Sequence, residues 1–182
     1  CHDSRGGAFT NNVAYNWSGA GFVAEDRDAS AIWTGNLACG VRFHGDPERQ
    51  YDERGWGYWF NGTNHSLSGN VAANCEYAAF EAWQKGSPID LTYDGPPFKS
   101  FESNEASRTK ESLSLYDIAG VIFKNFSAWS TNGAPQTGYP GGHMEWEGLT
   151  VYGDELPISY GWVFGAYPLI NPVIKSATIR GC

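Results

Sequence analysis

Asparagine recurs along this chain in one short phrase, in which an apolar or neutral residue and then a small residue come next. The five copies are Asn12-Val13-Ala14, Asn36-Leu37-Ala38, Asn70-Val71-Ala72, Asn104-Glu105-Ala106 and Asn125-Phe126-Ser127. Successive asparagines are 24, 34, 34 and 21 residues apart. A unit of roughly 20–50 residues that is reused along a chain is typical of solenoids, in which each repeat contacts only its neighbours. The spacing therefore predicts a stack of similar units.

An aromatic residue repeats in register with the asparagines. Phe22 lies ten residues after Asn12, Phe80 lies ten residues after Asn70, and each follows a small residue. Gly57-Tyr58 has the same form. Short runs rich in aromatic and β-branched residues favour strands over helices, and they include Ala31-Ile32-Trp33, Tyr58-Trp59-Phe60, Val121-Ile122-Phe123 and Ala177-Thr178-Ile179-Arg180. We predict an all-β right-handed parallel β-helix with loop insertions; a β-sandwich with loosely spaced asparagines is the alternative.

Asparagine suits the turns of such a solenoid. Its short amide tolerates left-handed backbone conformation and bonds to nearby main chain. Amides stacked in register can also bond the asparagine of the neighbouring unit, which satisfies groups that are costly to bury. We expect all five asparagines, including Asn125, to form such a ladder.

By length the chain is one domain, residues 1–182. It begins at Cys1, without an initiator Met, and ends at Cys182 in a predicted strand, so we expect a segment of a longer chain. Two segments interrupt the repeats, a charged insertion at about 40–56 and a Pro-rich one at about 84–100. Residues 131–182 form either the last repeats or a cap.

The net charge of −8 argues against nucleic acid as a partner, because such binding depends on Lys and Arg that neutralise phosphate. No stretch approaches the roughly 18 apolar residues of a membrane helix. The remaining partner classes are glycans and other copies of the chain.

Cysteines and glycosylation sequons indicate an extracellular or cell-surface location. The four cysteines, at positions 1, 39, 75 and 182, fit an oxidising compartment but allow three pairings. Cys39 and Cys75 follow ladder asparagines of successive repeats, so we predict that they pair; free buried thiols are the alternative. Four sequons are candidates for N-glycosylation, at Asn16, Asn61, Asn64 and Asn125. The two predictions for Asn125 conflict, because the ladder requires a buried amide and a glycan requires an exposed one.

Several phrases together resemble the parallel β-helix region of the G8-domain family, which includes the cell-migration-inducing hyaluronidase, the transmembrane hyaluronidase and fibrocystin-like surface proteins. The phrases are Cys1 to Gly6, Asn11 to Asn16, Gly19 to Asp26, Gly35 to Ala38, Gly69 to Ala73, Phe101 to Ser107 and Val121 to Phe126. The resemblance covers about residues 1–130 and implies a pectate-lyase-like β-helix outside the cell. The G8 domain that hyaluronan-degrading members carry ahead of the helix has no counterpart in these residues, so the resemblance does not by itself imply catalysis.

Acidic pairs one repeat apart suggest a possible site. His2-Asp3 precedes Glu25-Asp26 by 23 residues, so Asp3, Glu25 and Asp26 would lie on neighbouring units. Such carboxylates either act as general acid and base or share a calcium ion through oxygen ligands. Arg5, Arg27 and His44 would bind an anionic sugar. Alternatively, these groups are solvated turn residues paired with neighbouring arginines.

Two further features bear on function. Seven tryptophans either stack on sugar rings or pack under the insertions: Trp17, Trp56, Trp59, Trp83, Trp129, Trp146 and Trp162. Uncapped solenoid ends would stack head to tail into a filament. We therefore expect an extracellular glycosylated module with a structural, assembly or glycan-binding role. The alternative is a polysaccharide-active enzyme of hyaluronidase or lyase type, dependent on calcium.

Overall fold

The computed structural model describes residues 5–25, 30–45, 54–62, 64–83, 98–116, 121–131, 136–138, 144–153 and 173–180. Within these ranges the chain forms seventeen strands and no helix. The strands are β1 (Arg5–Thr10), β2 (Val13–Tyr15), β3 (Ala20–Ala24), β4 (Ser30–Thr34), β5 (Leu37–Cys39), β6 (Trp56–Asn61), β7 (His65–Ser68), β8 (Val71–Ala73), β9 (Ala78–Trp83), β10 (Ser100–Glu102), β11 (Glu105–Ser107), β12 (Glu111–Tyr116), β13 (Val121–Lys124), β14 (Ser127–Trp129), β15 (Gln136–Gly138), β16 (Met144–Tyr152) and β17 (Val173–Arg180).

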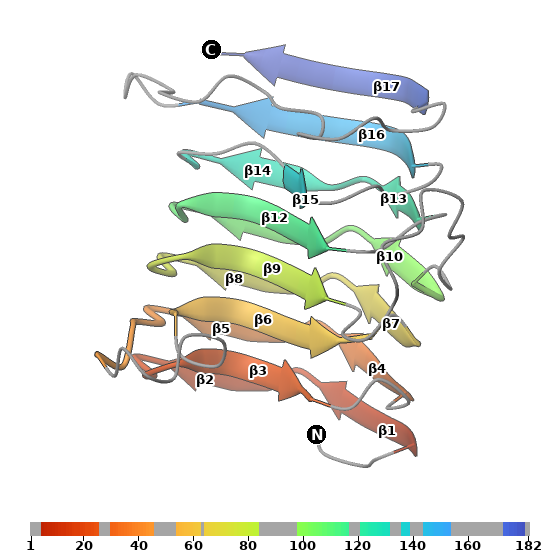
Figure 1. The fold of residues 1–182 in the computed structure, drawn as a ribbon. Helices are drawn as coiled ribbons and strands as arrows, with labels where there is room; N and C mark the ends of the chain where they lie inside the picture. Colours follow the sequence, from red (N-terminus) through yellow and green to blue (C-terminus); the bar gives the residue numbers. More distant parts are fainter. Residues whose placement is uncertain are drawn as a thin grey trace.

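The strands form three parallel series that run through the molecule (Figure 1). The first series is β1-β4-β7-β10-β13-β16, the second is β2-β5-β8-β11-β14-β16, and the third is β3-β6-β9-β12-β15. The long β16 belongs to the first two series and joins them in one 12-stranded sheet, while β17 pairs with β16. We call each level of the stack a rung, from β1–β3 to β17. All pairings between these strands are parallel, which confirms an all-β parallel fold and argues against the antiparallel β-sandwich.

The structure describes parts of the two predicted insertions and of the C-terminal segment 131–182. Of the insertion at 40–56, residues 46–53 lie outside the described residues, and Trp56 begins β6. Of the segment 84–100, only residues 98–100 are described. Within 131–182, the strands β15, β16 and β17 continue the parallel series.

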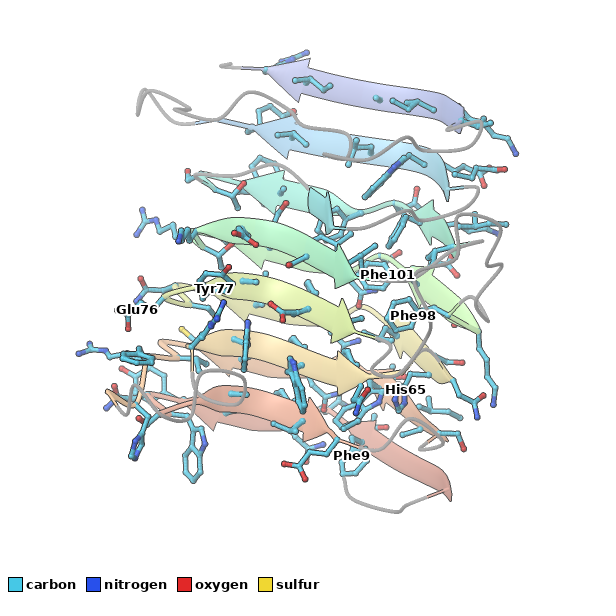
Figure 2. The ribbon with its side chains drawn as sticks, in the orientation of Figure 1. Phe9, His65, Glu76, Tyr77, Phe98 and Phe101 are labelled. Atoms are coloured by element: carbon cyan, nitrogen blue, oxygen red, sulfur yellow. The ribbon has the colours of Figure 1, made fainter. Side chains whose placement is uncertain are left out.

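The core consists of side chains that stack on their equivalents in the next rung. In the first series these are Phe9, Trp33, Leu67, Phe101, Phe123 and Trp146, and Figure 2 shows Phe9 and Phe101 on the same side of the stack. In the second series the core positions are alanines up to Ala128, followed by Val151. In the third series Phe22, Tyr58 and Phe80 stack with ring centroids 5.0 and 4.8 Å apart, which confirms the predicted aromatic register.

The predicted asparagine ladder is present over four rungs. Asn12 donates from its backbone N–H and its Nδ2 to Asn36 Oδ1, both at 2.9 Å. Asn36 donates in the same way to Asn70 Oδ1, at 3.1 and 2.9 Å, and Asn70 to Asn104 Oδ1, at 3.0 and 2.9 Å. A second Nδ2 bond runs to a backbone carbonyl of the preceding rung, from Asn36 to Phe9, from Asn70 to Trp33 and from Asn104 to Leu67. Each inner amide is thereby satisfied without water.

Asn125 does not belong to this ladder, so the prediction that placed it there was wrong. Ser127 pairs with Glu105, so the residue equivalent to Asn104 is Phe126, which is fully buried. Asn125 is exposed and occupies the turn position before it, with a φ of 50°. The same turn position has positive φ in the other rungs, at Asn11, Gly35, Gly69, Ser103 and Gly148. Asn125 therefore stabilises a left-handed turn, where asparagine is tolerated, and leaves its side chain at the surface.

Candidate functional site

Few of the predicted acidic and basic site residues fall within the described part of the chain. Asp3, Asp26 and Arg27 lie outside it, and Arg5 begins β1 with a side chain that is not described. Glu25 directly follows β3, and His44 follows the bridge at Arg42; both are exposed. Among described residues there is no group of three or more His, Cys, Asp or Glu that could hold a metal ion. The catalytic and calcium-binding roles of Asp3, Glu25 and Asp26 stay predictions.

The predicted Cys39–Cys75 disulfide is not formed, and both residues are free thiols. Cys39 neighbours the fully buried Ala38 on β5, so alternation turns its side chain to the outer face. Cys75 is buried in the core, where burial raises the pKa of its thiol to about 12. The two residues follow asparagines of adjacent rungs, but their side chains lie on opposite faces of the strand series.

The four sequons differ in accessibility. Asn16, Asn64 and Asn125 are exposed. Asn61 is only half exposed, and its Nδ2 donates to the backbone carbonyl of Glu25 at 2.7 Å. Exposure therefore suits Asn16, Asn64 and Asn125 for glycosylation better than Asn61.

The tryptophans divide between the two predicted roles. Trp56, Trp59 and Trp146 are buried, whereas Trp17 is 59% and Trp129 37% exposed. The side chains of Trp83 and Trp162 lie outside the described residues. Of the predicted sugar-stacking tryptophans, Trp17 and Trp129 thus have exposed rings.

Trp129 belongs to an aromatic platform on the outer face of the second series. Its ring stacks on Tyr152 of the next rung, with centroids 4.4 Å apart and planes inclined by 8°. On the preceding rung its partner is the small Ser107. Half-exposed polar residues form the neighbouring outward positions, at Glu105, Ser127 and Thr150. We call Trp129, Tyr152, Ser107, Glu105, Ser127 and Thr150 the Trp129 platform.

The Trp129 platform places an exposed aromatic ring beside polar side chains. The Trp129 ring contacts Tyr152 on the next rung, and the residue paired with Trp129 on the preceding rung is the small Ser107. Apolar faces of sugar rings pack on aromatic rings, and their hydroxyls bond to neighbouring polar groups. The hydroxyls of Ser107, Ser127, Thr150 and Tyr152 and the carboxylate of Glu105 belong to the platform, so it offers both donors and acceptors.

A second cluster lies on the outer face of the third series. Trp56 and Trp59 stack with centroids 5.8 Å apart, and Tyr77 meets Trp56 edge to face at 6.4 Å. Glu81 pairs in register with Ser114, and Glu111 with Ala78. We call Trp56, Trp59, Tyr77, Glu81, Glu111 and Ser114 the carboxylate patch. Figure 2 places Tyr77, beside Glu76, at the end of the strands opposite Phe98 and His65.

The carboxylate patch is buried, and this changes the protonation of its acids. Burial, with a smaller contribution from the neighbouring Glu111 carboxylate, raises the pKa of Glu81 to about 7. Burial also raises the pKa of Glu111, against the opposing charge of Lys110. Within the described part of the chain, Trp56 Nε1, Glu111 Oε2 and Ser114 Oγ make no hydrogen bond of standard geometry, although Trp56 and Ser114 lie close enough to Glu81 and Glu111 to oppose the rise in pKa of these two acids. The cations Lys110 and Arg54 lie 4.8 and 5.5 Å from the centre of the Tyr77 ring.

Sequence reasoning missed the carboxylate patch because the alternation of inward and outward side chains fails in β6. A Cβ on Gly57 would lie 2.6 Å from Ala72 Cβ and 3.3 Å from Cys75 Sγ, so Gly57 faces the core. Tyr58, the next residue, also faces the core and donates its hydroxyl to the Asn36 carbonyl at 2.7 Å. Side chains along a strand normally alternate between its two faces. Because Gly57 and Tyr58 both face the core, the residues on either side of them, Trp56 and Trp59, both face outward. The small residue followed by an aromatic one was the sequence signal for this pattern, and Gly21-Phe22 and Ala79-Phe80 share it with Gly57-Tyr58.

No protein-family model matches this chain, and neither the curated proteins nor the solved structures include a significant match. In the described residues we find no helix with the length and apolar character needed to cross a membrane.

Proposed function

We propose that this chain is an extracellular right-handed parallel β-helix module that binds a glycan on the Trp129 platform. The exposed Trp129–Tyr152 stack beside three hydroxyls is the observation that carries the proposal. A sugar ring would pack on the exposed ring of Trp129, beside Ser107. Its hydroxyls would bond to Ser127, Thr150 and Glu105.

The fold and location are part of the same proposal. Connections between parallel strands of one sheet are right-handed in about 98% of cases, which supports a right-handed helix for the three parallel series. The order of the repeat phrases supports a relationship to the pectate-lyase-like β-helix of the G8-domain family. Exposed sequons at Asn16, Asn64 and Asn125 support a secreted or cell-surface glycoprotein.

Titration with polysaccharides tests the binding role. We expect hyaluronan or pectate oligosaccharides to quench tryptophan fluorescence, and Trp129→Ala to weaken binding at least about tenfold, corresponding to about 1.4 kcal/mol. Trp17→Ala is the matched control, because Trp17 is also an exposed tryptophan but lies on the first rung. Absence of binding to both polysaccharides, or equal losses in the two variants, would refute the proposal.

The carboxylate patch supports a second candidate, a polysaccharide-cleaving enzyme. A carboxylic acid with a pKa near 7 can donate a proton to a leaving group at neutral pH, and Glu81 has such a pKa. Under this hypothesis Glu81→Gln abolishes the release of reducing ends or unsaturated products from hyaluronan or pectate, with calcium or without it. If the unsubstituted chain releases no product in any of these assays, the binding module remains and the enzyme is excluded for these substrates.

A further inference from the structure

A row of small side chains continues the Trp129 platform along the second series. Trp129 on β14 pairs with Ser107 on β11. Ser107 pairs in turn with Ala73 on β8, and Ala73 with Cys39 on β5. Each of the four follows a buried alanine, so alternation places all of them on the outer face. We call Ser107, Ala73 and Cys39, which are all half-exposed, the small-residue row.

The strands that carry the small-residue row lie inside the stack and are short. Each of β5, β8, β11 and β14 has a paired strand on both sides. Each has three residues, or about 10 Å, and is followed by a left-handed residue that begins a turn. Across the strands the outer face is continuous, and Figure 1 shows β5, β8 and β14 at successive heights of the stack. A long ligand therefore keeps contact with this sheet by lying across the strands.

Polar residues border the small-residue row on the side of these turns. Arg108 follows Ser107, Asn74 follows Ala73, and both Arg108 and Asn74 are exposed. The Arg108 N–H donates to the Trp129 carbonyl at 2.9 Å, and the Asn74 N–H donates to the Ser107 carbonyl at 2.8 Å. These bonds hold the polar residues in register with the row. The hydroxyls of a sugar chain on the row would have hydrogen-bonding side chains beside them on successive rungs.

The spacing of the rungs suits a sugar chain. Adjacent strands lie about 4.8 Å apart, which is close to the length of one sugar unit in a linear polysaccharide. We propose that the glycan of the Trp129 platform is a linear chain that runs across the strands, with one sugar unit per rung from Trp129 to Cys39. Trp129 and Cys39 are separated by three steps of about 14 Å in total, so this path holds about four units. The inference rests on the proposed glycan-binding function and adds the direction and the length of the ligand.

Titration with oligosaccharides of increasing length tests the length of the ligand. With hyaluronan and pectate fragments from disaccharide to octasaccharide, we expect the affinity to rise at least about tenfold between the shortest and the longest. Ala73→Glu places a bulky charge on the small-residue row and should remove this gain, because both polymers carry carboxylates. A disaccharide on Trp129 and Ser107 ends before the rung of Ala73. Its affinity should stay unchanged at physiological salt, which screens charges about 10 Å apart.

Ser68→Glu is the matched control for Ala73→Glu. Ser68 ends β7, in the same rung as Ala73, and is also half-exposed. It follows the buried Leu67, so it lies on the outer face of the first series, away from the small-residue row. The two variants change the net charge equally, and Ser68→Glu should leave the affinity for every oligosaccharide unchanged.

Alkylation of Cys39 tests the direction of the ligand. Cys39 is a half-exposed free thiol, so a maleimide reagent can reach it, and peptide mass spectrometry follows its modification separately. An octasaccharide at about ten times its Kd should slow this modification about tenfold, because the row is then free only about a tenth of the time. A disaccharide at ten times its own Kd should not slow it. Modification of the buried Cys75 reports any unfolding.

Three results would overturn the inference while leaving the Trp129 platform as a glycan site. The first is equal affinity for disaccharide and octasaccharide, which would show that the row does not contact the ligand. The second is an equal effect of Ala73→Glu and Ser68→Glu. The third is a Cys39 that reacts at the same rate with the octasaccharide bound, which would show that the chain takes another path. If no oligosaccharide binds, or if Trp129→Ala binds as well as the unsubstituted chain, the proposed function fails too.

Discussion

At the scale of single residues, the asparagine ladder is the feature that repetition predicted best. Four of the five asparagines bond as expected. A buried amide needs hydrogen-bond partners for its own N–H and C=O groups, and the amide of the neighbouring rung supplies them. The fifth was misplaced because the phrase Asn125-Phe126-Ser127 matches the pattern one residue too early. The alanines of the second series, which end at Ala128, would have given the correct register.

Removing a central ladder amide should destabilise the fold strongly. Asn70→Ala removes four buried bonds: the two that Asn70 Oδ1 accepts from the N–H and Nδ2 of Asn36, and the two that Asn70 Nδ2 donates to Asn104 Oδ1 and the Trp33 carbonyl. The Asn36 N–H is left without a partner, which costs about 1–3 kcal/mol, and each of the other lost bonds costs about 1 kcal/mol, so we expect the free energy of unfolding in urea to fall by at least about 3 kcal/mol. Asn12→Ala is the control, since Asn12 is exposed and should cost about 1 kcal/mol. Similar losses at both positions would show that the ladder contributes little.

Glu81 should make stability decrease as pH rises. Its pKa of about 7 in the folded chain exceeds the ordinary value of 4.5, so the folded state holds its proton more tightly than the unfolded state. The contribution of Glu81 to the free energy of unfolding is fully present below pH 4.5 and is lost as the pH rises through 7. Glu81→Gln removes the titration, and at pH 8 it should be more stable than the unsubstituted chain by about 3 kcal/mol.

The comparison must be made against the unsubstituted chain at each pH. Burial lowers the pKa of His65 to about 4, so His65 destabilises the fold as pH falls below its ordinary value of 6.5, in the opposite direction. The difference between Glu81→Gln and the unsubstituted chain cancels this contribution. A constant difference for Glu81→Gln from pH 4 to pH 8 would contradict the raised pKa.

At the scale of elements, sequence patterns predicted where the strands lie and in which order they come. They predicted less well which side chains of each strand face the core. The aromatic runs are strands β4, β6 and β13, as expected. Alternation fails in β6, where Gly57 and Tyr58 both face the core, and this places Trp56 and Trp59 together in the carboxylate patch. Of the Trp129 platform, the sequence predicted Trp129 as a candidate for stacking on sugars. It did not predict the partner Tyr152, because that pairing depends on the register between rungs.

The packing around Gly57 in β6 leaves no room for a side chain. A Cβ there would approach Ala72 Cβ and the Ala79 carbonyl oxygen, each to 2.6 Å. Gly57→Ala should therefore lower the free energy of unfolding by about 1–3 kcal/mol and weaken the near-ultraviolet circular dichroism of Trp56 and Trp59. Gly69→Ala adds no contact within 4 Å but has a φ of 63°, so it should cost about 1 kcal/mol and leave that signal unchanged. An unchanged aromatic signal in Gly57→Ala would show that the packing at Gly57 does not hold Trp56 and Trp59 in the carboxylate patch.

At the scale of the whole molecule, each rung is held by the rungs on either side, so protection against hydrogen exchange should follow position in the stack. Strands β4 to β13 have a paired neighbour on both sides, whereas β1, β2 and β17 have one among the described strands. Mass spectrometry at low protein concentration should therefore show faster exchange in peptides covering β1–β2 and β17 than in those covering β7–β11. Equal protection of all rungs would indicate that the stack opens as one cooperative unit.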